Sequence, residues 1–186
     1  MSAVLQAGLG PRPSPARRGA PTPAQVRPAA PEDYGRIVER VDAWSRGRFV
    51  GVALPRSFFQ HFADTSLLLF EGGELAGVLV GFRSQAQPRV AYVHYLAVAP
   101  GSRRQGHGRV LYEAFIRRAQ ALGCREVQAI APPVNSSLIA FHRQLGFEVV
   151  DGGGFACGIA VFRDYAGPGQ HRVLFRKCLD ERVGPA

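Results

Sequence analysis

Arginine, glycine and histidine gather in one short segment of this 186-residue chain, Pro100 to Gly108. A strand-like apolar run ends at Val98 just before it, and a helical pattern follows it. The first amides of a helix have no intrahelical partner, and the helix dipole favours a negative charge beside them. Glycines let the backbone approach an anion, and arginines supply paired donors. The sequence therefore predicts a phosphate-binding loop. The helix after it should bury one face, made of Val110, Leu111, Ala114 and Phe115.

The spacing separates this loop from two other phosphate loops. Gly101 and Gly106 have the GxxxxG separation of a nucleotide P-loop, but His107 and Gly108 stand where that loop needs Lys and Ser or Thr. A dinucleotide fingerprint needs GxGxxG, and the order here is GxxxxGxG. Arg-x-x-Gly-x-Gly does fit, and it begins at Arg103. This pattern resembles the acyl-coenzyme A loop of the GNAT N-acetyltransferase superfamily; an exposed basic turn is the alternative interpretation.

A second stretch, Asn135 to Phe147 (NSSLIAFHRQLGF), resembles the other signature of the same superfamily. In that signature an Asn opens a helix and Leu-Gly-Phe ends it. The same residues also make a capped structural helix, with Asn135 as N-cap and Gly146 in the left-handed position at the C-terminus. Two signatures in this order, separated by one helix and one strand, are far more specific than either alone. The resemblance covers about residues 26–150 and implies an acetyl-CoA-dependent N-acetyltransferase that acts on a primary amine.

The resemblance also implies which residues hold acetyl-CoA. The end of the strand before the loop would meet the pantetheine arm, the amides and arginines of the loop would hold the pyrophosphate, and Asn135 would bond the arm from the far side. The donor-binding set is then Leu96, Ala97, Val98, Arg103, Arg104, Gln105, Gly106, His107, Gly108, Arg109, Asn135 and Ser137. No metal is required, because transfer from a thioester needs only positioning, a deprotonated amine and support for the oxyanion.

Two histidines are the candidate proton-transfer groups. His142 stands where the second signature often carries a tyrosine that serves as general acid, and histidine can also donate a proton near neutral pH. Contact with coenzyme A is the alternative role for His142. His94, on the strand before the loop, is the first candidate base; a polar residue on a half-exposed strand is its alternative. Strand alternation puts Tyr92, His94 and Leu96 on one face, an assignment that a bulge at the strand's end would disturb.

The elements that must position these groups follow from periodicity. The segments 25–28, 66–71, 75–84 and 90–98 resemble strands, and helices open near Pro31 and Pro55. Gly72-Gly73 marks a tight turn, and consecutive strands joined by short turns are antiparallel. The later order predicts a crossover with a parallel pairing and then a closing hairpin. Its parts are helix 108–122, strand 124–130, helix 136–145, strand 147–150, and strands 159–162 and 172–177.

The predicted fold is α/β. As the resemblance implies, it has a mixed, mostly antiparallel central sheet with splayed central strands, flanked by about four helices. Residues 25–180 should form the acetyltransferase domain. Residues 1–24 are rich in Pro, Gly, Ala and Arg and should be disordered, and residues 181–186 should be a flexible C-terminus.

The acceptor side is the least specified part of the sequence. In the resembled family, the region between the first two helices and the last loop of the domain border the acceptor pocket. Phe58, Phe59 and His61 are therefore candidate contacts, although core packing is the role that their residue types favour. Asp164 and Tyr165 could select a cationic substrate, but a turn before Gly-Pro-Gly also accounts for them. Small amines, amino acids, toxic amines and protein N-termini or lysines all remain candidate acceptors.

Composition sets the outer limits. The chain is 46% hydrophobic with a formal charge of +9, and Lys177 is its only lysine. No apolar run is long enough to span a bilayer. The arginines are scattered rather than arranged in a stripe, so nucleic-acid binding is a distant alternative; a non-catalytic acyl-CoA-binding module is the nearer one. The three cysteines, Cys124, Cys157 and Cys178, suit reduced buried thiols of a cytoplasmic protein. A homodimer is common in the resembled family.

Overall fold

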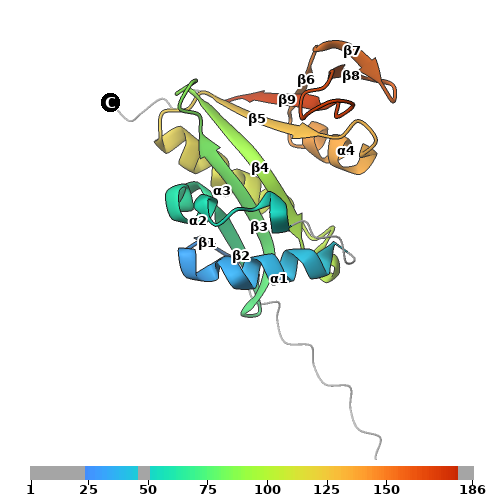
Figure 1. Cartoon of the computed structure of the whole chain (residues 1–186). Helices are drawn as coiled ribbons and strands as arrows, with labels where there is room; N and C mark the ends of the chain where they lie inside the picture. The colour runs from blue at the N-terminus through green and yellow to red at the C-terminus, as the bar shows by residue number, and fades with distance from the viewer. Residues whose placement is uncertain (1–23, 46–50, 180–186) are drawn as a thin grey trace, which may run out of the picture.

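The computed structural model describes residues 24–45 and 51–179, and within them a seven-stranded sheet forms the centre of the molecule (Figure 1). The strand order is β1-β2-β3-β4-β5-β9-β6, and β7 and β8 form a separate pair. The strands are β1 Gln25–Pro28, β2 Leu67–Glu71, β3 Glu74–Arg83, β4 Val90–Val98, β5 Glu126–Ala131, β6 Glu148–Val150, β7 Gly153–Ala156, β8 Ile159–Phe162 and β9 Val173–Cys178. The helices are α1 Tyr34–Trp44, α2 Ser57–His61, α3 His107–Ala121 and α4 Ser136–Gln144, with 3₁₀ turns at Pro31–Asp33, Gly51–Ala53, Ala63–Thr65 and Pro100–Ser102.

The two central strands separate partway along their length. β4 and β5 pair in parallel from Val90 with Glu126 to Val93 with Ala129, and the other described neighbours in the sheet are antiparallel. β4 continues to Val98 beyond this pairing, so its last residues have no β5 partner. The predicted mixed, mostly antiparallel sheet with splayed central strands is confirmed.

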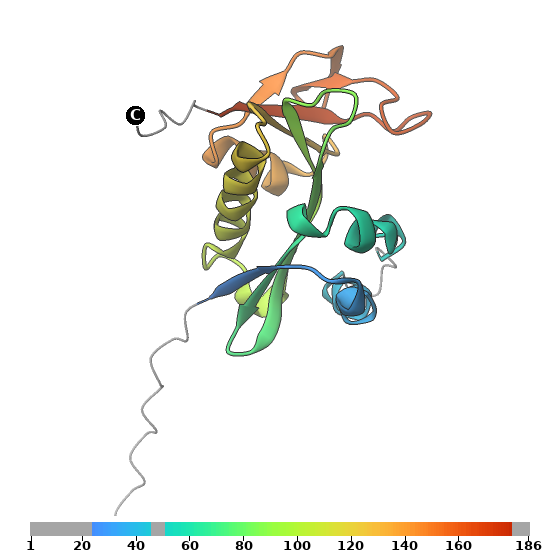
Figure 2. The ribbon, with the colours of Figure 1, turned by 90° about the vertical axis from the view of Figure 1, so that its left-hand side faces the viewer.

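Helices cover both faces of the sheet. In Figure 2, α3 lies on one side and α1 and α2 on the other. α3 packs closely on β3, because a Cβ added at Gly81 would lie 2.5 Å from Phe115 Cε2. Its buried residues include Leu111, Tyr112, Ala114, Phe115 and Ala119. Val110, predicted for this buried face, is 37% exposed, and Tyr112 takes part in the core instead.

β4 contains one extra residue, His94. Its neighbours Val93 and Tyr95 pair with consecutive residues of β3, so His94 forms a bulge. The bulge changes the direction of the side chains that follow: His94 stacks on a ring of α2, whereas Leu96 packs against the core on the α3 side. Tyr92 and His94 both contact the aromatic cluster of Phe58 and Phe82, whereas Leu96 leaves the predicted common face, as expected for a bulge.

The C-terminal strands pair differently from the predicted hairpin. β8 pairs with β7, not with β9, and β9 lies between β5 and β6, antiparallel to both. β8 reaches β9 through an isolated bridge between Phe162 and Arg172. The predicted strands do not include the glycine-rich segment that forms β7. Its pairing with β8 brings the two backbones too close for a side chain at Gly154. A Cβ at Gly154 would lie 2.9 Å from the Val161 carbonyl oxygen.

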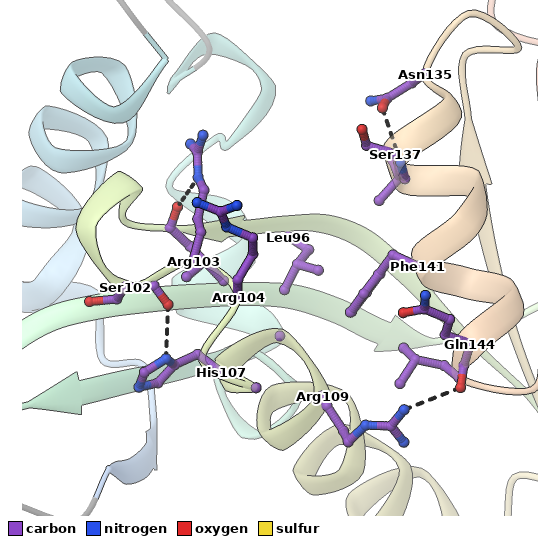
Figure 3. Close-up of a pocket in the computed structure, with 15 residues that line it drawn as sticks. Leu96, Ser102, Arg103, Arg104, His107, Arg109, Asn135, Ser137, Phe141 and Gln144 are labelled. Atoms are coloured by element: carbon purple, nitrogen blue, oxygen red, sulfur yellow. Dashed lines mark hydrogen bonds between the residues drawn. The ribbon is translucent and has the colours of Figure 1, made fainter. Parts of the chain in front are cut away.

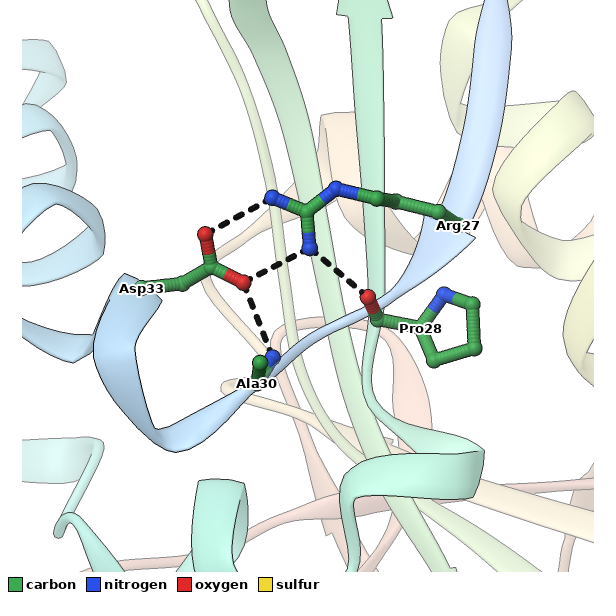
Figure 4. Close-up of polar contacts among 4 residues, drawn as sticks. All are labelled: Arg27, Pro28, Ala30 and Asp33. Carbon is green, nitrogen blue, oxygen red and sulfur yellow. Dashed lines mark hydrogen bonds and ion pairs between the residues drawn. The ribbon is translucent and has the colours of Figure 1, made fainter.

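A polar contact ties β1 to the start of α1 (Figure 4). The guanidinium of Arg27 donates to both carboxylate oxygens of Asp33, each at 2.7 Å, and Asp33 also accepts from the Ala30 N–H at 2.8 Å. The hydrogen bonds from Arg27 hold the pKa of Asp33 below its ordinary value. Arg27 lies 4.9 Å from the centroid of the Phe70 ring on β2. The contact therefore joins the first strand, the first helix and the sheet edge.

Several sequence expectations concern the chain as a whole. Cys124 is buried as expected, but Cys157 and Cys178 are exposed; all three are free thiols. Among the described helices, none is both long and apolar enough to cross a membrane, and the described residues contain no cluster suited to a metal ion. The predicted N-terminal extension and C-terminal tail fall almost wholly outside the described residues, so the domain boundaries stay predictions.

Candidate active site

A cleft of about 600 Å³ opens where β4 leaves β5, between the N-terminal end of α3 and one side of α4 (Figure 3). All the predicted donor-binding residues line it except Ala97 and Gln105. Its lining consists of Leu96, Val98, Ser102, Arg103, Arg104, Gly106, His107, Gly108, Arg109, Asn135, Ser137, Leu138, Phe141, Gln144 and Leu145.

One end of the cleft is built from the first turn of α3. Gly106 is the N-cap, with φ of 85°, a conformation that favours glycine. The first helical bond runs from the Val110 N–H to the Gly106 carbonyl at 3.0 Å. The N–H groups of His107, Gly108 and Arg109 therefore have no acceptor within the helix, and the helix dipole adds to their partial positive charge. This end of the cleft is suited to an anion.

The middle of the cleft is narrow and apolar. Leu96 and Phe141 extend toward each other from β4 and α4 (Figure 3). Gly108 lets α3 approach α4, because a Cβ at this position would lie 3.0 Å from Phe141 Cζ. The two glycines of the loop thus serve different purposes: Gly106 supplies a backbone conformation, and Gly108 supplies space.

Two of the three arginines in the cleft brace its walls. Arg103 Nε donates to the Val98 carbonyl at 3.0 Å, and its Nη2 lies 3.4 Å from the Trp44 carbonyl. Arg109 Nη2 donates to the Gln144 carbonyl at 3.2 Å, joining α3 to the end of α4. Arg104, with φ of 62°, is exposed at the cleft. The predicted pyrophosphate contact by the Arg103 side chain therefore competes with bonds that hold the loop in place.

The end of β4 presents backbone groups to the gap beside β5. The Ala99 N–H donates to the Ala76 carbonyl of the β2–β3 hairpin at 2.8 Å. Along an antiparallel pair, alternate residues direct their N–H and C=O toward the partner strand, so those of Leu96 and Val98 face the opposite way. They face the gap, where β5 no longer pairs. Ala97 packs against the core on the α1 side, which explains its place outside the cleft.

The remaining donor-binding predictions divide between helix capping and loop contacts. Asn135 Oδ1 accepts from the Leu138 N–H at 3.1 Å and caps α4, which leaves its amide NH₂ for a ligand. Ser137 lines the cleft in the first turn of the same helix. The side chain of Gln105 donates to the Gly101 carbonyl at 3.0 Å and does not line the cleft.

His142 lies in the core and outside the cleft, with 2% of its surface exposed. Its Nδ1 donates to the Leu138 carbonyl at 2.9 Å, so its Nε2 accepts from the Tyr112 hydroxyl at 2.7 Å. The ring stacks on Phe175, with centroids 4.4 Å apart. Burial lowers the pKa of His142 and favours the neutral ring. The sequence predicts His142 as a proton donor, but both of its ring nitrogens are hydrogen-bonded to protein partners in the core.

His94 lies on the opposite side of β4 from the cleft lining and is exposed. Its Nε2 is 2.7 Å from the Ala53 carbonyl, and a carbonyl oxygen only accepts, so Nε2 carries the hydrogen. The neutral ring therefore has its lone pair on Nδ1. Phe58 stacks on the ring with centroids 4.5 Å apart and planes inclined by 21°. His94 is thus a fixed imidazole with one nitrogen able to accept a proton.

The other acceptor-side predictions have mixed outcomes. Phe59 is fully buried in the core, and His61 lines a separate hollow beside Arg83. Asp164 accepts from the Gly169 N–H at 2.7 Å, as a turn residue would. Tyr165 is 46% exposed and lies close enough to Tyr92 to contribute, after burial, to raising the pKa of the Tyr92 phenol.

Sequence reasoning missed five residues of the cleft. Four of them, Leu138, Phe141, Gln144 and Leu145, lie on α4 or at its C-terminal end, and Ser102 ends the 3₁₀ turn before Arg103. Residues three, four and seven apart share a helix face, so the spacing from Ser137 could have identified Phe141 and Gln144 as part of a wall, and the spacing from Phe141 could then have added Leu138 and Leu145. Leu138 and Leu145 have an apolar character that suits either the core or such a wall.

Comparisons with known proteins agree with this geometry. The model of the acetyltransferase (GNAT) family matches residues 31–147. Ard1 from Thermoplasma volcanium superposes with a TM-score of 0.69 at 18% identity, covering 85% of this chain and 99% of that one. The ribosomal-protein-S18-alanine N-acetyltransferase from Escherichia coli gives 0.61 at 17% identity, covering 86% and 98%. A phosphinothricin acetyltransferase from Sinorhizobium meliloti, solved in complex with AcCoA, gives 0.62 at 20% identity, covering 88% and 92%. A search of curated proteins finds no significant match. The chain belongs to the acetyltransferase (GNAT) family.

Proposed function

We propose that the protein transfers an acetyl group from acetyl-CoA to a primary amine by direct attack in a ternary complex. The observation that supports this most is the cleft itself, which joins an anion-binding helix N-terminus to a narrow apolar passage beside the splayed strands. A molecule with a charged diphosphate and a slender arm fits that sequence of environments. We assign the activity to the predicted domain, residues 25–180.

Each part of the cleft has a task in holding acetyl-CoA. The N–H groups of His107, Gly108 and Arg109 would bind the pyrophosphate together with Arg104. The Leu96 carbonyl and the Val98 N–H, which face the gap, would pair with the pantetheine arm as a neighbouring strand would, and the apolar wall of α4 would exclude water from it.

The bound thioester supplies an activated acetyl carbonyl and a thiolate leaving group. The acceptor arrives as an ammonium and loses two protons: one to a base before attack, and one that ends on the departing sulfur. His94 Nδ1 is the proposed base, directly or through a water, because the bond to Ala53 keeps its lone pair on that nitrogen. The Leu96 N–H, which faces the gap, would stabilise the developing charge on the carbonyl oxygen.

The burial of His142 favours a second candidate function, a non-catalytic acyl-CoA-binding module. At the position where the signature often carries its acid, this chain has a histidine bonded within the core. In the catalytic proposal, the thiolate therefore takes its proton from water or from the acceptor amine. In the binding proposal, no proton transfer is needed.

A thiol-release assay tests the proposed function. Acetyl-CoA and the protein are mixed with a panel of small amines, amino acids, aminoglycoside-type amines and peptides with free N-termini or lysines, and free thiol is measured. Release that depends on one acceptor class supports catalysis and identifies the substrate. Coenzyme A binding by calorimetry without amine-dependent release on any acceptor supports the binding module. The proposal includes a cytoplasmic location, which rests on the number and spacing of the cysteines, and a homodimer, which sedimentation would test.

A further inference from the structure

Three residues beside the phosphate-binding end of the cleft form a chain of contacts. Ser102 Oγ donates to Glu71 Oε2 at 2.9 Å. His107 Nδ1 donates to the Ser102 carbonyl at 3.0 Å, a bond drawn in Figure 3. In the neutral ring that donates from Nδ1, Nε2 has no hydrogen, so its 3.6 Å separation from Glu71 Oε1 is an ion pair only when the ring carries both protons. Ser102 and His107 line the cleft, and His107 is only 6% exposed. Glu71, the last residue of β2, belongs to neither sequence signature.

A carboxylate in this place is unexpected on electrostatic grounds. The cleft carries arginines and a helix N-terminus, which attract an anion. Glu71 does not line the cleft but contacts Ser102, which does. Through space alone, a negative charge there would weaken the binding of a diphosphate. A favourable effect of Glu71 on diphosphate binding must therefore come from its contacts with the loop rather than from its charge.

We propose that Glu71 is a positioning residue for the acetyl donor, which acts through Ser102 and His107 to hold the pyrophosphate loop in its binding conformation. The inference rests on the proposed function, since the ligand is coenzyme A. The loop is then braced on both flanks, by Arg103 bonded to Val98 on one side and by the Glu71 network on the other. A loop ordered before the ligand arrives binds more tightly, because less conformational freedom is lost on binding.

The neighbouring hairpin residue provides a matched control. Glu74 pairs with Glu71 across the β2–β3 turn, but its carboxylate faces Arg40 at 3.3 Å and Arg36 at 3.9 Å and is 72% exposed. Glu71→Ala and Glu74→Ala change the net charge equally, and both act on the same turn. Only Glu71→Ala releases the loop.

Calorimetric titration with coenzyme A separates loop positioning from a purely electrostatic effect of Glu71, because the two predict opposite changes in the Kd of Glu71→Ala. Loss of a charge-assisted contact to a partly exposed loop should raise the Kd of Glu71→Ala about tenfold, which corresponds to about 1.4 kcal/mol. Glu74→Ala should change the Kd by less than about twofold. If Glu71 acts only as a charge, Glu71→Ala should bind coenzyme A more tightly than the wild type. Tighter or unchanged binding would overturn the proposal.

Further measurements separate positioning from general damage to the fold. Pantetheine lacks the diphosphate, so its Kd should be the same for Glu71→Ala and the wild type; equal losses for both ligands would overturn the proposal.

Glu71→Gln keeps an acceptor for Ser102 and should recover most of the affinity. Ser102→Ala, which removes only the hydroxyl, should raise the coenzyme A Kd in the same direction, and its effect should be smaller when added to Glu71→Ala. This variant carries the test even where Glu71→Ala does not fold. A wild type that binds no coenzyme A would overturn the proposed function as well, whereas wild-type binding with no change in either variant overturns this inference alone.

Discussion

Gly106→Ala tests whether the backbone conformation at the N-cap of α3 underlies donor binding. An added Cβ at Gly106 would meet nothing within 4 Å, so the substitution introduces no clash. Its effect comes from the φ of 85°, where an L-residue costs about 1–2 kcal/mol relative to glycine. If the free loop keeps this conformation, the free energy of unfolding falls by that amount. If the free loop relaxes, the Kd for coenzyme A rises about 5- to 30-fold instead.

The two effects share a single strain energy, so their sum is the quantity to measure. Urea unfolding gives the stability term, and calorimetry with coenzyme A gives the binding term. Gly101→Ala is the matched control in the same loop: its added Cβ is also unobstructed, and its φ lies outside the left-handed region. It should leave the Kd unchanged and stabilise the fold by up to about 1 kcal/mol. A Gly106→Ala protein with both stability and affinity unchanged would refute the reasoning, and so would equal losses in both variants.

Three further predictions concern single contacts. His94→Gln should lower kcat/KM by a factor of about 100 or more and abolish the acid limb of its pH profile, with an unchanged Kd for coenzyme A, because the residue does not line the donor cleft. Tyr112→Phe should lower the free energy of unfolding by about 1–3 kcal/mol in urea titrations, because it leaves His142 Nε2 buried without its donor. Asp33→Asn should cost up to about 1 kcal/mol near neutral pH, an estimate that allows for the exposure of Arg27. The folded pKa of Asp33 is lowered, so the stability from the ion pair is present above the ordinary aspartate value and disappears as pH falls through the lower folded value. Unfolding midpoints of wild type and Asp33→Asn should therefore converge in acid.

Each of these has a contrary outcome. A His94→Gln enzyme that keeps its acid limb would show that another group takes the proton. A Tyr112→Phe protein as stable as the wild type would show that the buried imidazole finds a second donor. A difference between Asp33→Asn and the wild type that persists in strong acid would assign the stability of the β1–α1 contact to something other than the carboxylate.

Features that depend on neighbouring residues could be predicted from the sequence. The loop from Arg103 to Gly108 needs a positive φ at Gly106, and this requirement is local. Asn135 caps its helix through a bond to a residue three positions ahead. β1 lies at the residues where the sequence predicts it, and the parallel pairing of β4 and β5 follows from the order of the elements. The family and the donor cleft are therefore predictable from the amino-acid sequence alone.

Features that depend on distant residues were decided by the tertiary structure. The bulge at His94 arises from the register between β3 and β4, which no pattern within β4 reveals. His142 is polar in sequence, yet it becomes a core residue because Tyr112 and Phe175, from elsewhere in the chain, surround it. β9 lies between β5 and β6, and its backbone hydrogen bonds do not depend on residue type, so its pattern does not reveal these neighbours. Glu71 reaches the loop across 31 positions of sequence. Local chemistry thus determined the loop and the helix cap that are proposed to bind the donor, whereas long-range packing decided which side chains stand beside them.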